Sequence, residues 1–503
     1  MAATLKQFRR IVPAVLLVLA AAVTAELFAG PRSEVRTPAV AGSFYSADPG
    51  ELTKTVDAML ARPAPQVDVQ SIVALVAPHA GYQFSGGVAA NSYAALKGRR
   101  VRRVVVIAPS HYESFPFAAV YDGRAYATPL GEITVDREFA RRLASRNSFI
   151  KLAGNGHTTS GDRGEHALEV QLPFLQRALG SFQLVPVVMG GQDYQTSRAL
   201  GVALARLISG SETLIVASSD LSHFHPYEQA VQLDHATLGA IEQGDYLTLS
   251  HNLENRTWEA CGGGPIVAAM IAAERLGANQ VKVLKYANSG DITGDRARVV
   301  GYGSVALMRS PQKPRSSSQR TAISRDEQQQ LLKLARKSVE TAVRQGKLFD
   351  PPAMSNAALV SPRGAFVTLT KKSQLRGCIG YTVPVKPLYL TVRDVAAFAA
   401  LRDTRFPPVS EGELGELEYE ISVLTPFRRM LDVNQLHIGE HGLLVRQGDQ
   451  IGVLLPQVAT EQHWDKKTFL EQACLKAGLP ENAWRDEDTD VFLFSATVFG
   501  ERQ

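Results

Sequence analysis

The first 300 residues contain short, uninterrupted apolar runs that alternate with stretches of helical periodicity. Four of these runs are rich in β-branched residues, and they span 72–77, 104–108, 184–189 and 214–217. Apolar runs without alternating polar positions are typical of strands buried on both faces, and helices between such strands predict an α/β sheet. Ligands usually bind beyond the carboxyl ends of the strands in such sheets. We therefore expect the chemistry of this region in the loops that follow the runs.

The last 180 residues follow a different order. Apolar positions at helical spacing from 331 to 343 predict a helix, and 365–369 and 419–424 are predicted strands. The runs 442–445 and 451–455 enclose a polar segment with the composition of a hairpin. A final helix carries Cys474 on its apolar face, so we expect this cysteine in the core. This order of elements predicts a smaller α+β domain.

The segment 310–324 separates these two patterns. It is rich in proline, serine and basic residues and has almost no apolar side chain to bury. Such a composition is typical of a linker. We therefore divide the chain into a first domain over 35–309 and a second over 325–503, and we expect each to fold as a unit.

The first 25 residues have the pattern of an export signal. Lys6, Arg9 and Arg10 precede an apolar stretch over 11–22, which is short for a bilayer span. Small residues at 23–25 form a suitable cleavage site. We expect a cleaved signal peptide over 1–25 and a periplasmic or extracellular protein. The alternative is an uncleaved segment that anchors the protein to the membrane.

Composition and charge narrow the classes of function. Apolar residues make up 45% and charged residues 20% of the 503 positions, which excludes a disordered chain and a polytopic membrane protein. The formal charge is +5, but three of the basic residues lie in the predicted signal, so nothing indicates a nucleic-acid partner. The three cysteines are far apart, which excludes a disulfide framework and a zinc ribbon.

Residues capable of metal binding or catalysis follow three of the four buried runs. His79 follows the first run, His111 follows the second, and Asp220 and His223 follow the fourth. A fifth candidate, Cys261, lies in a glycine loop just before a predicted helix. The helix dipole there favours a thiolate, and a thiolate is a metal ligand or a nucleophile. Each residue alone also has a plainer interpretation. A histidine after a strand is often a hydrogen-bonded loop residue, the Asp220–His223 pair is compatible with a helix cap, and Cys261 with simple packing.

The segments PHAGYQFSGG, APSHY, GEHALEVQLPFLQ, SSDLSHF and CGGGPI, in this order over about 270 residues, resemble those of the Memo family. The resemblance implies a fold similar to the class III extradiol dioxygenases and a pocket associated with iron or copper. It places the pocket residues at His79, His111, Asp220, His223 and Cys261. The dioxygenases have two histidines and a glutamate on ferrous iron, so the cysteine is a departure. Ring cleavage therefore does not transfer directly.

Two ligand sets remain open on chemical grounds. In the first, His79, His111 and Cys261 bind one transition metal, with iron or copper favoured and zinc as an option, while Asp220 and His223 face the open side as catalytic groups. In the second, Asp220 replaces Cys261 in a facial triad. We favour the first set, because a helix N-terminus helps to keep the thiol ionised.

Three further residues of the first domain are candidates for substrate contacts or for support of the metal ligands. These are Tyr82, Glu165 and His166. His166 and Glu169 share a face if the segment is helical, although Pro173 suggests that the helix begins there. The alternative for this segment is a salt-bridged surface.

The second domain contains the segment Leu375-Arg376-Gly377-Cys378-Ile379-Gly380. With RFPPV, ISVLTPF, GLLV, VLLPQVA and KAGLPENAW, it resembles the AMMECR family over nearly all of 325–503. Cys378 beside Arg376 is a candidate reactive thiol, because a cation lowers a thiol pKa. The alternatives are a buried cysteine and a binding role for the motif formed by Arg376, Gly377, Cys378 and Gly380.

The two resemblances together imply a protein of the AmmeMemoRadiSam type, which associates such domains with a radical SAM protein. The first hypothesis is a metal-dependent oxidoreductase or oxygenase that acts on an unknown small molecule. A metal-assisted hydrolase is the next option. The competing hypothesis is a non-catalytic metal- or ligand-binding module with a docking domain. An exported protein does not share a compartment with a radical SAM enzyme. Three alternatives remain: a diffusible product links the two across the membrane, this protein works without that partner, or the N-terminal segment is not an export signal.

Overall fold

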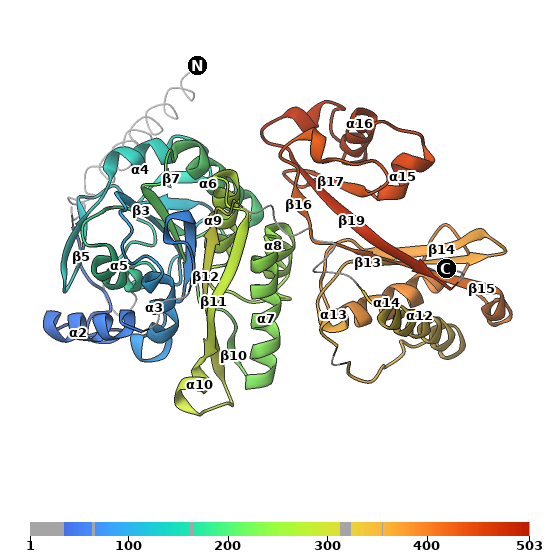
Figure 1. Ribbon diagram of the computed structural model, residues 1–503, viewed down its shortest axis with the longest axis horizontal. Helices are drawn as coiled ribbons and strands as arrows, with labels where there is room; N and C mark the ends of the chain where they lie inside the picture. Colours follow the sequence, from blue (N-terminus) through green and yellow to red (C-terminus); the bar gives the residue numbers. More distant parts are fainter. Residues whose placement is uncertain (1–34, 63–65, 160–163, 312–322, 355, 502–503) are drawn as a thin grey trace, which may run out of the picture.

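The computed structural model describes residues 35–62, 66–159, 164–311, 323–354 and 356–501. The predicted signal peptide over 1–25 and most of the predicted linker lie outside these residues. Two α/β units lie side by side along the long axis of the molecule (Figure 1). Among the described residues, no helix combines the length and the apolar character needed to cross a membrane.

A nine-stranded mixed sheet forms the centre of the first domain. Its order is β10-β12-β2-β9-β3-β8-β4-β7, and β11 pairs with β12. The four neighbours β2, β9, β3 and β8 are parallel. These strands are the four apolar runs of the sequence, so that prediction is confirmed. The strands are β2 (Ile72–Ala77), β3 (Arg103–Pro109), β4 (Ala118–Val120), β7 (Ile150–Leu152), β8 (Gln183–Met189), β9 (Thr213–Ser218), β10 (His223–His225), β11 (Gln280–Asn288) and β12 (Val299–Met308).

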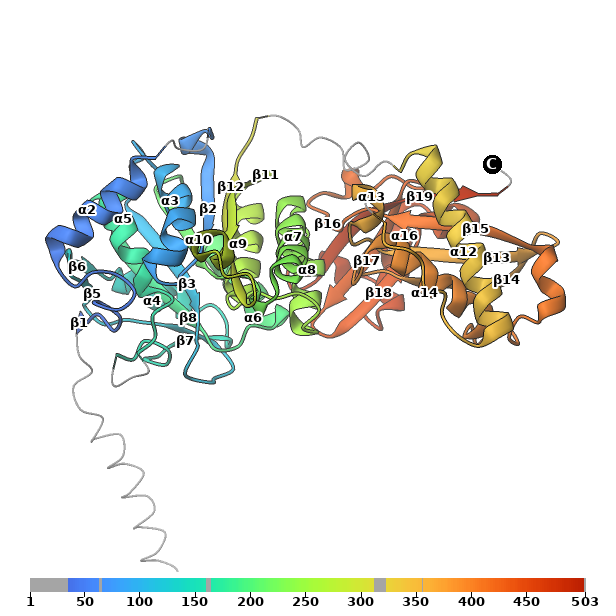
Figure 2. The ribbon, with the colours of Figure 1, turned by 90° about the horizontal axis from the view of Figure 1, so that it is seen from below.

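Helices cover both faces of this sheet, which explains why its central strands are apolar at every position (Figures 1 and 2). One face packs against α4 (Arg137–Ala144), α6 (Tyr194–Leu207), α7 (Tyr227–Gln243), α8 (Tyr246–Glu254) and α9 (Gly263–Arg275). The other face packs against α2 (Pro49–Leu60), α3 (Gly87–Ala94) and α5 (Leu172–Leu179). A short helix, α10 (Ser289–Thr293), joins β11 to the last strand.

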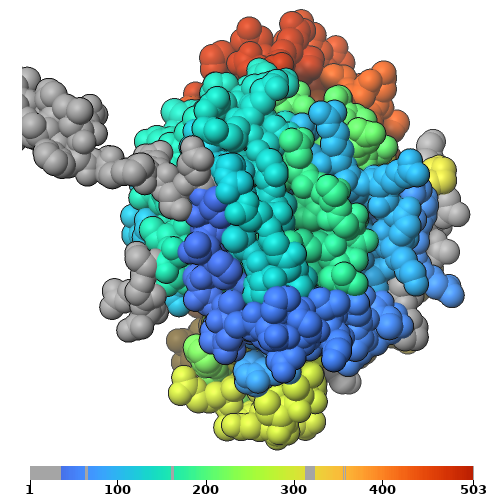
Figure 3. Space-filling model, turned by 90° about the vertical axis from the view of Figure 1, so that its left-hand side faces the viewer, coloured from blue at the N-terminus to red at the C-terminus, as the bar shows by residue number. Residues whose placement is uncertain are grey.

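A smaller three-stranded sheet of β1 (Val35–Arg36), β5 (Ala125–Thr128) and β6 (Gly131–Thr134) lies beside the main one. Its first strand begins the N-terminal segment, which lies across the end of the first domain that faces away from the second (Figure 3). Arg36 anchors this segment inside the protein, with its guanidinium 2.7 Å from Glu169. Both side chains are buried, so the segment around Arg36 is part of the core of this domain.

The second domain is built on a seven-stranded sheet in the order β14-β13-β15-β19-β17-β18, with β16 paired to β19. Helices α12 and α14 pack together against one half of the sheet, and α15 and α16 lie at the other half (Figure 1). The predicted helices, strands and hairpin are confirmed, as is the burial of Cys474. The elements are α12 (Arg325–Gln345), α13 (Ala357–Val360), β13 (Ala365–Lys371), β14 (Gln374–Tyr381), α14 (Leu388–Leu401), β15 (Leu417–Leu424), β16 (Arg428–Arg429), β17 (His441–Gln447), β18 (Gln450–Leu454), α15 (Pro456–Glu461), α16 (Lys466–Lys476) and β19 (Asp490–Gly500).

The two domains share a hydrophobic interface. Phe427, Phe492 and Phe494 of the second domain belong to the same buried cluster as residues of α6, α8 and α9. The ring of Phe492 lies 5.8 Å from that of Tyr246 between centroids. The linker composition indicates where the domains divide, but it does not reveal this contact.

Candidate metal centre

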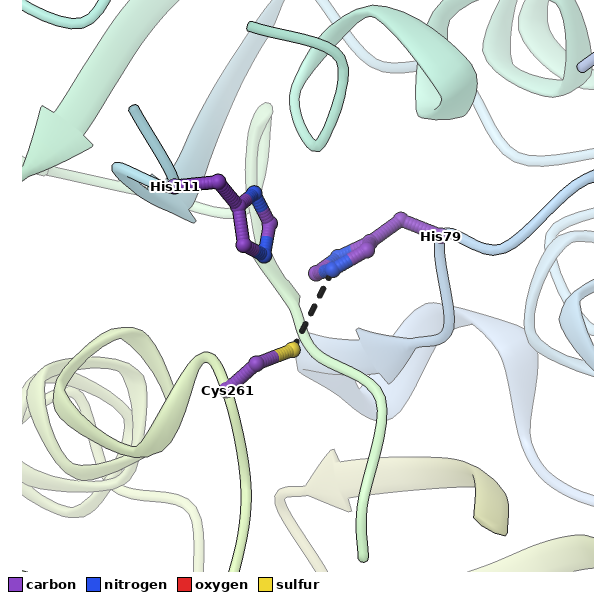
Figure 4. Close-up of side chains that lie close together, drawn as sticks. All are labelled: His79, His111 and Cys261. Carbon is purple, nitrogen blue, oxygen red and sulfur yellow. Dashed lines mark hydrogen bonds between the residues drawn. The ribbon is translucent and has the colours of Figure 1, made fainter. Parts of the chain in front are cut away.

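The loops after β2, β9 and β3 meet at one edge of the main sheet, because these parallel strands are direct neighbours. They deliver His79, Asp220 and His111. Cys261 reaches the same place from the turn before α9, although it lies far along the chain. Figure 4 shows the two imidazoles and the thiol pointing toward one another. The convergence of strand-end residues expected from the sequence is therefore what the structure contains.

The ligand atoms of His79, His111 and Cys261 lie within 4.8 Å of one another. The Cys261 Sγ atom is 3.2 Å from Nε2 of His79. His79 is almost fully buried, Cys261 is half-buried and His111 is exposed, so the group opens to solvent on the His111 side. Two imidazoles and one sulfur suit a transition metal with a further position left for water or substrate.

Hydrogen bonds fix the protonation of the His79 ring. Its Nδ1 atom lies 2.9 Å from the Ser218 hydroxyl. That hydroxyl donates its one proton to the carbonyl of Ala167, and it accepts from Gln171. The His79 Nδ1 atom must therefore be the donor, which leaves the Nε2 lone pair for a metal. Burial is the main cause that lowers the pKa of His79 well below 6.5, so the ring is neutral at pH 7.

Glu165 fixes the His111 ring in the same way. Its Oε1 atom lies 3.0 Å from Nδ1 of His111, and Oε2 accepts the His111 backbone N–H at 2.6 Å. Although burial opposes ionisation, the hydrogen bonds from His111 and from the backbone N–H of Ala167 hold the pKa of Glu165 at about 2. The carboxylate is therefore charged and accepts the Nδ1 proton, which leaves Nε2 of His111 as the ring nitrogen available to a metal. This carboxylate–histidine pair is common behind metal ligands.

The Cys261 thiol differs from the sequence expectation. Burial, followed by the nearby Asp220 carboxylate, raises its pKa far above the ordinary value, whereas the helix position predicts a lowered one. The expectation of a thiolate is wrong for the metal-free protein, because desolvation outweighs the effect of the α9 N-terminus. The sulfur does accept the backbone N–H of Asp220 at 3.2 Å, a contact that also favours a bound thiolate.

Asp220 supports the backbone beside His79. Its Oδ1 atom accepts the His79 N–H at 2.8 Å, and the N–H of Ala80 also donates to the carboxylate. Burial raises its pKa to about 6. Among the described residues, the Asp220 carboxylate joins no cluster of three ligand atoms. The geometry thus favours the thiol over Asp220 as the third ligand.

The ring of His223 is hydrogen-bonded to the backbone of its own loop. Its Nδ1 atom donates to the carbonyl of Leu221 at 2.8 Å, because a carbonyl can only accept. This bond leaves Nε2 as the ring nitrogen available for proton transfer. Glu259, which sequence reasoning missed, accepts the His223 N–H and lies 2.8 Å from His225. Between the two histidines Phe224 has a φ of 63°, a conformation that costs about 1–3 kcal/mol and often marks functional loops.

The GEHALE segment lies beside the ligands and is not a salt-bridged surface. The His166 ring stacks on that of His111, with 4.8 Å between centroids. His111, Glu165 and His166 form a second cluster of donor atoms, in which Glu165 is already bonded to Nδ1 of His111. The hydroxyl of Tyr82 is buried and donates to the carbonyl of Val170 at 2.8 Å. The regular helix begins at Leu172, as Pro173 indicated.

Three glycines let the Cys261 loop approach its neighbours. A Cβ on Gly262 would lie 2.2 Å from the Ser218 carbonyl oxygen, and one on Gly264 would lie 2.8 Å from the Cβ of Gln192. A Cβ on Gly263 would collide with Leu253. The run of glycines after a lone cysteine was the sequence signal for this packing. The sequence has no such signal for the hydrogen bonds that Gln171, Gln192 and Ser218 make beside the ligands.

The second-domain motif lies on β14 and is separate from the histidine cluster. Arg376 is held by Glu413 at 2.9 Å and by the carbonyl of Pro407. Gly377 lies against α14, where a Cβ would meet the Ala399 carbonyl oxygen at 2.1 Å. The other glycine, Gly380, lies against a ring in the same manner. These contacts give Arg376 and the glycines structural roles.

Cys378 lies between these residues. Its backbone N–H donates to Asp403 at 2.8 Å, and its sulfur accepts from the hydroxyl of Thr368 at 3.3 Å. Arg405 donates to its carbonyl and is paired with Asp403. Among the described residues, Cys378 belongs to no cluster of metal-binding atoms.

Two family models match the chain. The model described as Memo-like protein matches residues 36–306, and the model described as AMMECR1 matches residues 332–499. The two matches fall on the two domains in order, and the first covers more than half of the chain.

Individual proteins give the same result for the first domain. A MEMO1 family protein from Methanopyrus kandleri is 36% identical over 285 residues, which are 54% of this chain and 99% of that protein. One from Aeropyrum pernix is 38% identical over 286 residues and is covered completely. In a separate comparison with solved structures, the chain is similar to an uncharacterized protein of Pyrococcus horikoshii, with 40% identity over 34% of this chain and 89% of that one and a TM-score of 0.32.

Proposed function

Because the chain belongs to the Memo-like protein family and carries an AMMECR1 domain after the Memo-like one, we propose that it is a metal-dependent oxidoreductase acting on a small substrate. The chemistry would reside in the Memo-like domain. One observation carries the proposal: His79, His111 and Cys261 present two imidazole nitrogens and one sulfur within 4.8 Å of one another. The resemblance of this family to class III extradiol dioxygenases supports the choice of redox chemistry.

The residues fit such a metal. His79 and His111 would bind through Nε2, because hydrogen bonds occupy both Nδ1 atoms. Cys261 would bind after losing its thiol proton. An iron or copper ion held there supplies one-electron chemistry and a coordination position for the substrate.

The neighbouring groups supply the proton chemistry. His223 would accept a proton from the substrate at Nε2. When it is protonated, its charge lowers the pKa of both His79 and Asp220. Glu165 and Asp220 would hold the side chain of His111 and the backbone of His79 in place.

The test is oxygen consumption by the full-length protein. The protein is loaded with ferrous iron or with copper and mixed with fractions of a cell extract, and depleted compounds are identified by mass spectrometry. We expect oxygen uptake that needs both the extract and the loaded protein and is absent in a double His79→Ala, His111→Ala variant. Depletion of a compound without oxygen uptake would favour metal-assisted hydrolysis. Metal binding without either change would favour a non-catalytic binding module with the AMMECR1 domain as its docking part.

A further inference from the structure

The side chain of Gln192 ties the loop of Cys261 to the loop after β8. Its Nε2 atom donates to the Cys261 carbonyl at 3.0 Å, and its Oε1 atom accepts the N–H of Gly264 at 2.9 Å. The two bonds flank the turn that carries the thiol. They use both ends of the amide, so the position of Gln192 sets the position of that turn relative to the sheet.

Gln192 is itself fixed by the start of α6. Asp193 caps this helix, and Tyr194 is its first residue. The Tyr194 N–H donates to Glu254 of α8 at 2.7 Å. A displacement of the first turn of α6 would therefore move Gln192, which directly precedes the cap.

The first turn of α6 is held by the second domain. The Tyr194 hydroxyl donates to Oδ2 of Asp490 at 3.0 Å, and Nε of Arg198 donates to the same atom at 2.6 Å. Arg275, the last residue of α9, donates to Oδ1 at 3.1 Å. Asp490 is only 2% exposed. One buried carboxylate of the second domain thus joins the two helices that position the Cys261 loop.

The charges around Asp490 are paired across the interface when the two domains are in contact. Two half-buried arginines of the first domain, Arg198 and Arg275, have Asp490 as their common partner across the interface. A partly buried cation that loses its partner is destabilising. The arrangement of α6 and α9 therefore depends on the carboxylate that the second domain supplies.

We propose that the AMMECR1 domain controls the geometry of the metal centre through this chain of contacts, with Gln192 as the positioning residue and Asp490 as the docking contact. The inference rests on the proposed function, because it concerns the same centre. It gives the second domain a role in tuning the Cys261 ligand, with no chemistry of its own required.

The experiment is a cobalt(II) titration of the full-length protein, followed by the thiolate-to-cobalt charge-transfer absorption. We expect Gln192→Ala to weaken cobalt binding by about 10- to 100-fold, the usual effect of losing a group behind a metal ligand. Asp490→Asn and the milder Tyr194→Phe should weaken binding in the same direction by a smaller factor. All three should lower the charge-transfer intensity per bound cobalt.

A matched control and a double variant separate this effect from general damage to the interface. Glu487→Gln removes an exposed ion pair with Arg206 at the far end of α6 and should bind cobalt as the unaltered protein does. The double Gln192→Ala, Asp490→Asn variant should bind no more weakly than Gln192→Ala alone, because the second change acts through the first.

Two results would overturn the proposal. If Tyr194→Phe and Asp490→Asn are folded by circular dichroism and bind cobalt with an unchanged spectrum, the domains do not communicate through this chain, while the metal site itself stands. If the unaltered protein shows no thiolate-to-cobalt absorption, the proposed metal site fails, and this inference fails with it.

Discussion

The Nδ1 atom of His111 lies 3.0 Å from Oε1 of Glu165, and the second oxygen of that carboxylate accepts the backbone N–H of the same histidine. This pair decides which nitrogen of the more exposed imidazole is free. It also places a charged group, almost completely buried, directly behind a candidate metal ligand.

Replacing Glu165 with glutamine removes this charge and keeps the shape. We expect Glu165→Gln to weaken metal binding by about 10- to 100-fold, because the amide is a poorer acceptor and permits the other His111 tautomer. A competition titration with a chromophoric chelator measures this. Glu242→Gln, on the exposed side of α7, is the matched control. Equal affinities in the two variants would mean that Glu165 does not orient the ligand.

Metal binding should release protons. The raised pKa of Cys261 means that the metal-free thiol is protonated at pH 7, and the lowered pKa of His79 means that this ring is already neutral. Binding to the thiolate should thus release about one proton, so that affinity rises about tenfold per pH unit below the thiol pKa. Titration calorimetry in two buffers of different ionisation enthalpy measures the number of protons released per metal bound. Cys261→Ser should release almost none, and no release from the unaltered protein would contradict Cys261 as a ligand.

Stability should depend on pH through Glu274 at the domain interface. Burial raises its pKa to about 7, and the Tyr246 hydroxyl donates to it at 3.0 Å. Because the pKa of Glu274 is raised, its contribution to the free energy of unfolding is fully present below the unfolded-state pKa near 4.5. That contribution is lost as the pH rises through about 7. Glu274→Gln should remove this loss and be more stable than the unaltered protein at pH 8 by up to about 3 kcal/mol.

Urea unfolding of the metal-free protein between pH 4 and pH 8 measures the difference. Glu242→Gln should follow the unaltered protein at every pH. If Glu274→Gln follows it too, then Glu274 is ionised in the folded protein without penalty.

Cys378 should be dispensable for metal binding. It lies on β14 of the second domain, and one thiol without neighbouring ligands does not hold a metal. Cys378→Ser should keep the full metal content by mass spectrometry, whereas Cys261→Ser should lose most of it. Metal loss in the Cys378 variant would mean that the two domains share one site.

The sequence predicts the residues of the centre better than their roles. Uninterrupted apolar runs identify β2, β3, β8 and β9, and the residues after them are visible because parallel strands bring their ends together. The sequence does not reveal that Asp220 accepts backbone N–H groups or that burial raises the Cys261 pKa. Both depend on packing between segments far apart in the chain.

Supporting groups were harder to predict for the same reason. Glu165 was a candidate only because it lies in the GEHALE segment, and its partner His111 is 54 residues away. Gln192 is an ordinary polar residue in a loop, and only the position of α9 makes it a bridge. The domain interface had no sequence signal, because Asp490 looks like any acid at the start of a strand.

The measurement that tests the central claim most directly is X-ray absorption at the metal edge, with metal content, on the unaltered protein, Cys261→Ser and Asp220→Asn. The account predicts a metal–sulfur shell near 2.3 Å, the usual zinc–thiolate distance, that is lost only in Cys261→Ser. Asp220→Asn should keep both its metal and this shell. Full metal retention in Cys261→Ser together with metal loss in Asp220→Asn would contradict the account and assign the third position to the carboxylate.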